Sequence, residues 1–141
     1  MKTEFYTNLK KYMIAIVTLM LLANATFAQE KSYQQLEQKD RIVKNLENGI
    51  NSKNLGLKRS AIYLAGKYEV VEVVPELIKQ FKENAESNIR YLIAIVLYKI
   101  SDQNGLRFLN NIAKYENDPK VKNVISIIIL AQSDDKVLAN R

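Results

Sequence analysis

The most constraining feature of this chain is a pattern that recurs at a constant interval, at positions 57, 89 and 121. In each unit a polar residue is followed three positions later by an apolar–basic pair that opens a strongly apolar run. The three pairs are Leu57-Lys58, Ile89-Arg90 and Val121-Lys122. A fixed period of ~20–50 residues is typical of repeat proteins, whose units bury their apolar faces only against their neighbours. The sequence therefore predicts stacked repeats between positions 54 and 130, but it does not identify a ligand.

The spacing of apolar residues predicts helices in every unit and therefore an all-α fold. Apolar positions recur at three- and four-residue intervals, which is the period of an amphipathic helix. The passage Val70–Val74 is β-branched and resembles a strand. Pro75, however, suits the first turn of a helix, so we interpret residues 70–73 as a connection. The expected helices span residues 30–52, 57–68, 74–84, 89–100, 106–113 and 119–130, followed by a short tail helix capped at Ser133-Asp134-Asp135. Residues 101–105 are the expected turn before the fifth helix, and Asp118 is the expected cap of the sixth.

Residues 1–28 have the features of a secretory signal peptide. Three lysines among the first eleven residues are followed by an uncharged run, Met13–Ala23, that is too short to span a ~30 Å hydrocarbon core as a helix. Small residues then precede a cut after Ala28. We expect cleavage there, which leaves residues 29–141 as one domain without a membrane span in the periplasm or outside the cell. The alternative is a retained N-terminal anchor. The chain has no cysteine, so it offers neither a lipid attachment site at the cut nor a disulfide.

Three segments carry a family resemblance. They are Lys58–Tyr68, Val74-Pro75-Glu76-Leu77-Ile78, and Asp118-Pro119-Lys120-Val121-Lys122 with the apolar helix behind it. The first and third resemble the first helix of a short bacterial HEAT-type repeat, and the second is similar to the start of that repeat's second helix. The resemblance covers roughly residues 40–132 and implies an α-α superhelix, a short solenoid of about three helical hairpins. Such a superhelix is generally a binding surface without catalysis. The last unit departs from the pattern, because Ile125–Ile129 is heavily β-branched and no full second helix follows.

The repeat register also assigns faces. In residues 57–68 we expect an inward face of Leu57, Ala61, Leu64, Ala65 and Tyr68. In the last full helix Val121, Ile125, Ile128 and Ile129 should face inward, as Ile89, Ile93, Val96 and Leu97 do. That assignment leaves Val124, Ile127 and Leu130 as apolar residues on the remaining faces. Because repeat stacks normally end in polar surface, this end either docks on a second copy or a partner, or is covered by the tail.

Charge and composition exclude several classes of function. The formal net charge of +6 falls to +4 once residues 1–28 are removed, and no block of five or six like charges occurs, which argues against nucleic acid as a partner. The chain has no histidine, no cysteine and no glycine-rich phosphate loop. The commonest general base, the thiol nucleophile and the usual zinc ligands are therefore missing. We predict a protein that is not an enzyme and holds neither cofactor nor metal.

Some residues invite a functional interpretation but are better explained structurally. The recurring basic residues Lys58, Arg90 and Lys122 lie four positions after Asn54, Glu86 and Asp118. Side chains at this spacing meet on a helix, so we interpret them as a structural ladder and not as a polyanion stripe. Tyr63, Tyr68, Tyr91 and Tyr98 are interpreted as core or boundary residues.

Two classes of function remain. The leading hypothesis is a protein-interaction or assembly module of the cell envelope, whose partner is another protein or, through the C-terminal end, a second copy. The alternative is weak binding of a polyanion (nucleic acid or acidic polysaccharide) by a basic helical face. Phe108 and Tyr115 are expected either as an exposed aromatic pair or as the margin of a wider core. The candidate binding residues are Lys79, Lys82, Phe108, Asn111, Lys114, Tyr115, Val124, Ile127 and Leu130.

Overall fold

The computed structural model describes residues 36–139, with side chains through residue 133. The predicted signal peptide and the predicted helix start at residue 30 lie outside these residues. The chain divides into two compact units, residues 1–41 and 42–141. Of the first unit the described part, residues 36–41, is helical and exposed. The second unit contains the helices that follow.

The described part of the chain is helical and contains no strand, as the apolar spacing predicts. It begins with helix 36–50. The later elements are α2 (Leu55–Lys67), a 3-10 helix (Val71–Val73), α3 (Val74–Glu83), α4 (Ser87–Ile100), α5 (Gln103–Ile112) and α6 (Pro119–Ala139). The starts of α2, α4 and α6 are separated by the same interval as the sequence repeat, and α5 follows the 3-10 helix at that interval too. The structure therefore repeats with the period of the sequence. A HEAT-type superhelix stays a prediction.

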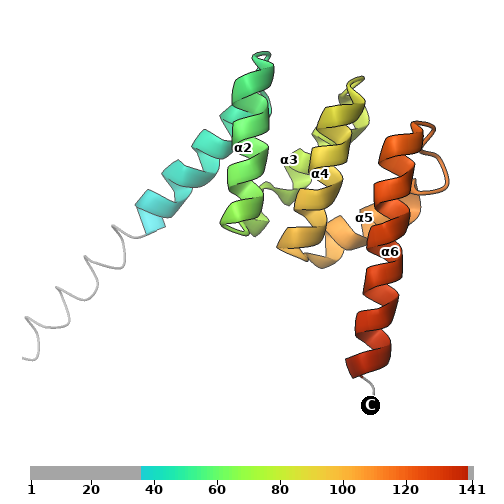
Figure 1. Ribbon diagram of the computed structural model, residues 1–141. Helices are drawn as coiled ribbons and strands as arrows, with labels where there is room; N and C mark the ends of the chain where they lie inside the picture. Colours follow the sequence, from blue (N-terminus) through green and yellow to red (C-terminus); the bar gives the residue numbers. More distant parts are fainter. Residues whose placement is uncertain (1–35, 140–141) are drawn as a thin grey trace, which may run out of the picture. The chain divides into compact units, whose positions relative to one another are not determined.

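The helices from α2 onward form two layers. Helices α2, α4 and α6 lie side by side and are called the front row (Figure 1). Helices α3 and α5 pack against each other behind them and are called the back row. Helix α4 contacts α2 and α6 in its own row and α3 and α5 in the other. The core therefore lies between the rows and is centred on α4.

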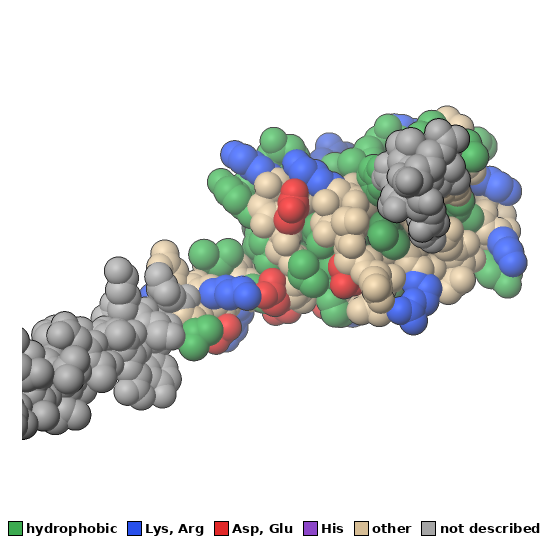
Figure 2. Space-filling model, turned by 90° about the horizontal axis from the view of Figure 1, so that it is seen from below, with side chains coloured by type: hydrophobic (Ala, Val, Ile, Leu, Met, Phe, Trp, Pro, Cys, Tyr) green, Lys and Arg blue, Asp and Glu red, His purple; other side chains and the backbone are tan. Residues whose placement is uncertain are grey.

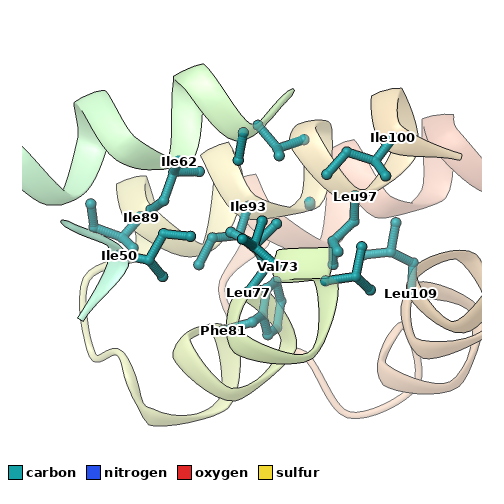
Figure 3. Packing of buried hydrophobic residues seen from close by; sticks show 14 of the residues in the cluster. Ile50, Ile62, Val73, Leu77, Phe81, Ile89, Ile93, Leu97, Ile100 and Leu109 are labelled. Carbon is teal, nitrogen blue, oxygen red and sulfur yellow. The ribbon is translucent and has the colours of Figure 1, made fainter. Parts of the chain in front are cut away.

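The buried residues of α4 explain why its sequence is apolar almost all round. Ile89, Ile93 and Leu97 are fully buried and Val96 nearly so, as the repeat register predicts. They meet back-row residues such as Leu77 in the space between the layers (Figure 3). Each buried aliphatic side chain of this size contributes roughly 1.5–3 kcal/mol to folding.

Two glycines mark places where helices approach closely. A methyl group at Gly66 in α2 would lie 2.8 Å from Cγ2 of Val96 in α4. A methyl group at Gly49 in helix 36–50 would lie 2.6 Å from Cβ of Ala61 in α2. Neither distance leaves room for a side chain. These glycines therefore set the spacing between helix 36–50 and α2 and between α2 and α4.

Polar side chains define where the helices begin. Asp118 Oδ1 accepts hydrogen bonds from the backbone N–H groups of Lys120 (3.0 Å) and Val121 (3.1 Å), which confirms the predicted cap of α6. Asn54 caps α2 in the same way through the N–H of Leu57. The expected turn before α5 is shorter than predicted. Ser101 has a left-handed backbone (φ 58°) that ends α4 within one residue, so α5 already begins at Gln103.

The predicted tail helix is wrong. Helix α6 continues without a break through residues 133–135 to Ala139. Ser133 does not cap a new helix, because its hydroxyl donates to the carbonyl of Ile129 at 3.0 Å. Within the described backbone, no segment after residue 130 turns back over the outer side of α6.

The predicted inward face of α2 is also partly wrong. Its buried residues are Lys58, Ala61, Ile62, Ala65 and Gly66. Leu57 and Tyr68 are exposed, by 54% and 66% respectively. The buried face is rotated toward α4, because α4 is the single front-row neighbour that α2 has among the described helices. The opposite side of α2 meets helix 36–50, which leaves part of it uncovered.

Candidate functional site

A cation and two aromatic rings meet on what we call the back-row surface. This surface is formed by α3, α5 and the residues after α5, and it carries six of the candidate binding residues: Lys79, Lys82, Phe108, Asn111, Lys114 and Tyr115. The rings of Phe81 (α3) and Phe108 (α5) contact edge to face, with centroids 5.2 Å apart and planes at 80°. The ammonium of Lys82 lies 5.6 Å from the centroid of Phe108. Phe108 is therefore half-buried and serves as the margin of the core, which was the second of its two predicted environments.

Tyr115 is the most exposed large hydrophobic side chain of this surface. It follows α5 and is 74% exposed. It borders a shallow hollow of about 260 Å³ that Lys82 and Ile112 also line. An amphipathic ring beside a cation and an apolar margin is the composition of a protein contact site.

The remaining back-row candidates are solvated. Lys79, one turn before Lys82 on α3, pairs with Glu76 at 3.2 Å, and its side chain is 53% exposed. Asn111 on α5 and Lys114, which follows α5, are exposed. The structure therefore brings Lys82 and Tyr115 to one hollow and places Lys82 over the ring of Phe108. The other three candidates are exposed residues of α3, of α5 and of the segment after α5.

An ion pair forms the floor of this hollow. Arg90 of α4 donates from Nε to Oε2 of Glu116 at 3.1 Å and from Nη2 to Oε1 at 3.2 Å. Its Nη1 also donates to the carbonyls of Asn84 (2.9 Å) and Ala85 (3.1 Å). The side chains are only 17% and 7% exposed. This pair holds the loops before α4 and α6 in place, and Glu116 is a residue that our sequence reasoning missed.

Asp118 lies at the rim of the same hollow. The N–H of Val121 is the main group that holds the pKa of the Asp118 carboxyl below its ordinary value, with smaller help from the N–H of Lys120, the side chain of Ser87 and the charge of Arg90. A helix N-terminus favours the charged carboxylate in this position. The role of Asp118 is to cap α6 and to connect it with α4.

The predicted ladder is structural, but its pairs are different from those expected. Lys58 donates to Oε1 of Gln80 on α3 at 2.6 Å, and Gln80 in turn donates to Asn51 at 3.0 Å. Neither Lys58 nor Arg90 forms its main contact with the residue four positions earlier, because those residues cap or precede their helices. Both cations are therefore used inside the fold, whereas Lys122 is exposed.

The predicted residues at the C-terminal end divide into two groups. Ile127 and Leu130 are exposed by 56% and 66%, as the register predicts for uncovered positions. Val124 is buried, at 9% exposure, which corrects its assignment. Helix α6 meets α4 through positions 121, 124, 125 and 128, so Val124 lies inside this contact and Ile129 only at its edge.

The tyrosines differ from their predicted environments in two cases. Tyr91 and Tyr98 are half-buried boundary residues, as expected. Tyr63 of α2 and Tyr68, the residue after α2, are exposed by 59% and 66%.

Two further hollows were not predicted. The larger, of about 630 Å³, lies where α4, α5 and α6 meet and is lined by Tyr98, Ser101, Gln103, Leu106, Arg107, Asn110 and Gln132. The second, of about 250 Å³, is called the α2 groove and is lined by Ile42, Asn45, Leu46, Gly49, Leu57, Ser60, Ala61 and Leu64. The sequence signal for this groove was the pair Leu57 and Leu64, which lie at helical spacing on α2 and are exposed.

The described residues offer no group of three or more acidic side chains that could hold a metal ion. Among the same residues no helix combines the length and the apolar character needed to cross a membrane. The carboxylates nearest the hollow, Glu116 and Asp118, are occupied by Arg90 and by the backbone of α6.

Comparison with known proteins gives no match, whether with family models, with curated proteins or with solved structures. The functional conclusion therefore rests on the geometry of these surfaces.

Proposed function

We propose that this protein is an exported, non-catalytic helical-repeat module that binds another protein of the cell envelope through the back-row surface. The observation that carries the proposal is Tyr115, a 74% exposed ring beside the hollow that Lys82 and Ile112 line. Tyrosine supplies a large contact area with few rotatable bonds, which makes it a preferred anchor in protein interfaces.

The surroundings of Tyr115 support this use. The hollow is held open by Arg90 and Glu116 below it and by the Phe81–Phe108 contact beside it. A partner would therefore meet a surface that is already ordered, so little conformational entropy is lost on binding. Export is supported by the pattern of residues 1–28, and HEAT-type architecture by the regular interval between the helix starts.

The polyanion alternative has weaker support. Two of the three recurring basic residues, Lys58 and Arg90, are bound to Gln80 and Glu116 inside the fold. Figure 2 shows Lys and Arg side chains scattered among hydrophobic and other side chains on the face in view, without one large basic patch. A surface of this kind binds few phosphates at once.

Site-directed photocrosslinking in cells tests the proposal. A photoreactive amino acid is placed at position 115 of the full chain, and at position 71 as a control. Val71 is also apolar and exposed, but it lies in the 3-10 helix between α2 and α3. We expect a defined protein adduct from position 115 that position 71 does not give, identified by mass spectrometry.

Three results would count against the proposal. They are the same adducts from both positions, no protein adduct from position 115, or an adduct with nucleic acid or polysaccharide. The last of these would favour the polyanion alternative. Tyr115→Ala should reduce recovery of the same partner in a pull-down, without a change in helical circular dichroism.

A further inference from the structure

Helices α2 and α6 lie at opposite ends of the front row (Figure 1). Each of them carries an apolar surface. One is the α2 groove, on the side of α2 that faces away from α4. The other is the outer side of α6, where Ile127 and Leu130 are exposed by 56% and 66%. Within the described residues neither surface is covered, because α6 continues straight and helix 36–50 covers only part of α2. Exposed aliphatic surface of this kind at both ends of a stack requires an explanation.

The groove repeats the positions by which later front-row helices receive their neighbour. Leu57 and Leu64 are 54% and 38% exposed, whereas their equivalents one period later, Ile89 and Val96, are 0% and 4% exposed. Helix α2 covers this part of α4, and Gly66 contacts Val96 directly. The equivalents on α6, Val121 and Ile128, are buried as well. The α2 groove is thus the seat of a preceding front-row helix that this chain does not supply among its described residues.

The outer side of α6 repeats the positions by which earlier helices contact the next one. Leu130 is the equivalent of Gly66 in α2 and of Tyr98 in α4. Gly66 meets α4, and Tyr98 lines a hollow together with Gln132 of α6. Ser126 also loses the cover that its equivalents have: it is exposed, whereas Ile62 in α2 and Ala94 in α4 are fully buried. Helix α6 therefore presents a contact side with no following helix among the described residues.

We infer that these two surfaces bind each other between copies of the chain. The outer side of α6 in one copy lies in the α2 groove of the next, so that the front row continues from copy to copy. Gly66 meets Val96, whose equivalent one period earlier is Leu64, and Leu130 is the equivalent of Gly66 two periods later. The contact between copies therefore places Leu130 of one copy against Leu64 of the next.

The chemistry of the two surfaces fits this contact. Both are aliphatic at their centres, and the groove of about 250 Å³ is large enough for projecting side chains such as Leu130. Ser126 does not oppose burial, because its hydroxyl already donates to the carbonyl of Lys122 at 3.0 Å. A second copy is the occupant that the structure favours, since the contact continues one that the chain already makes twice internally, from α2 to α4 and from α4 to α6.

This association is head to tail and not two-fold symmetric. A copy that is bound through one surface still has the other surface free to bind a further copy. Assemblies therefore grow end to end unless they close into a ring. The inference uses the two ends of the front row and leaves the back-row surface exposed. It therefore stands apart from the proposed function, and either can fail without the other.

The test uses one variant at each end. Leu130→Lys blocks the outer side of α6, and Leu64→Lys blocks the groove, while circular dichroism confirms that each remains helical. Val71→Lys is the matched control, since it also adds a charge at an exposed apolar position. Protein recovered from cells expressing the full chain is examined by analytical ultracentrifugation over a range of concentrations. Leu57→Lys replaces Leu64→Lys if the latter does not fold.

We expect wild type and Val71→Lys to form a concentration-dependent series of oligomers, and each end variant alone to be monomeric. The decisive sample is the mixture of Leu130→Lys with Leu64→Lys. Each variant retains the surface that the other lacks, so the mixture should form a one-to-one dimer and stop there. Monomeric wild type would overturn the inference, because the groove would then be empty or covered by the chain's own residues before 36. It would also be overturned by a mixture that stays monomeric, or by Leu64→Lys that still dimerises alone, which would indicate a symmetric contact through α6.

Disulfide trapping tests the position of the contact independently. The chain has no cysteine of its own, so introduced cysteines can pair only with each other. When Leu130→Cys and Leu64→Cys are mixed under mild oxidation, the mixed disulfide dimer should dominate over both homodimers. The reverse outcome, with homodimers in excess, would contradict the head-to-tail register.

Discussion

The buried ion pair beneath the back-row hollow allows a quantitative prediction. Arg90 and Glu116 form two hydrogen bonds at 3.1 and 3.2 Å, and their side chains are 17% and 7% exposed. Removal of one partner from a desolvated pair leaves a buried charge without compensation and typically costs about 3–5 kcal/mol. Glu116 Oε1 also accepts the N–H of Asp118 at 2.8 Å, and that hydrogen bond is lost as well in Glu116→Ala. Because Arg90 keeps two backbone carbonyls, we expect about 3 kcal/mol, the lower end of the range.

The exposed pair Arg59–Glu86 is the matched control. Its atoms are 3.8 Å apart and its side chains are 51% and 44% exposed, so Glu86→Ala should cost no more than about 1 kcal/mol. Urea unfolding followed by circular dichroism measures both losses. A double-mutant cycle with Arg90→Met should give a coupling energy of about 2 kcal/mol. If Glu116→Ala costs no more than Glu86→Ala, the hollow does not rest on a desolvated ion pair, and its preorganisation is refuted.

Four further predictions follow from single positions. Gly49→Ala should destabilise the fold by about 1 kcal/mol in urea unfolding, because overpacking against Ala61 outweighs the gain in helix propensity; a stabilised variant would contradict the close approach. Asp118→Asn should be less stable than wild type near neutral pH and equally stable in acid. Because the fold lowers the pKa of the Asp118 carboxyl, the carboxylate stabilises the fold at pH values above its unfolded pKa. This contribution disappears as the pH falls through the folded pKa, below about 4. A difference that persists in strong acid would exclude this cause. At concentrations where the chain is monomeric, Ile127→Lys should change stability by less than about 0.5 kcal/mol, whereas a large loss would show that the chain itself covers the position. The intact mass of the envelope fraction should correspond to a chain that begins at Gln29, and the full-length mass in membranes would indicate a retained anchor.

The helical architecture was predictable because repetition makes the sequence signal redundant. Any one unit is ambiguous: Val70–Val74, for example, has strand-like composition and forms a 3-10 turn and the start of α3 instead. Pro75, which suits the first turn of a helix, resolved that ambiguity correctly. Where a residue type has one strong local role, as Asp118 does at the start of α6, the prediction was confirmed to the atom.

The faces of the end helices were less predictable, because burial there depends on neighbours and not on period. Leu57 and its equivalent Ile89 share a position, yet one is 54% exposed and the other fully buried. The difference arises from the presence or absence of a preceding front-row helix, which the local sequence does not encode. Val124 was misassigned for a similar reason, since the contact between α6 and α4 is broader than a single helical stripe.

Polar contacts across long sequence separations were the hardest to predict. Lys58 and Gln80 are 22 positions apart, and Arg90 and Glu116 are 26 apart. Nearer polar residues satisfied the helical spacing rule equally well, but Asn54 caps α2 and Glu86 forms an exposed ion pair with Arg59. Tyr115 is exposed, which was one of the two environments that the pattern predicted for it. Its role as a binding residue stays a prediction.

The salt dependence of partner binding tests the central claim most directly, since it separates a protein contact from polyanion binding. The dissociation constant of the partner crosslinked at Tyr115 is measured with purified components at about 50 mM and about 200 mM salt. We predict less than a tenfold change, because the contact is made by an aromatic ring and an apolar margin. A fall in affinity of about 10³-fold or more over this range would indicate release of many counterions, and it would contradict a protein-interaction surface at the back row.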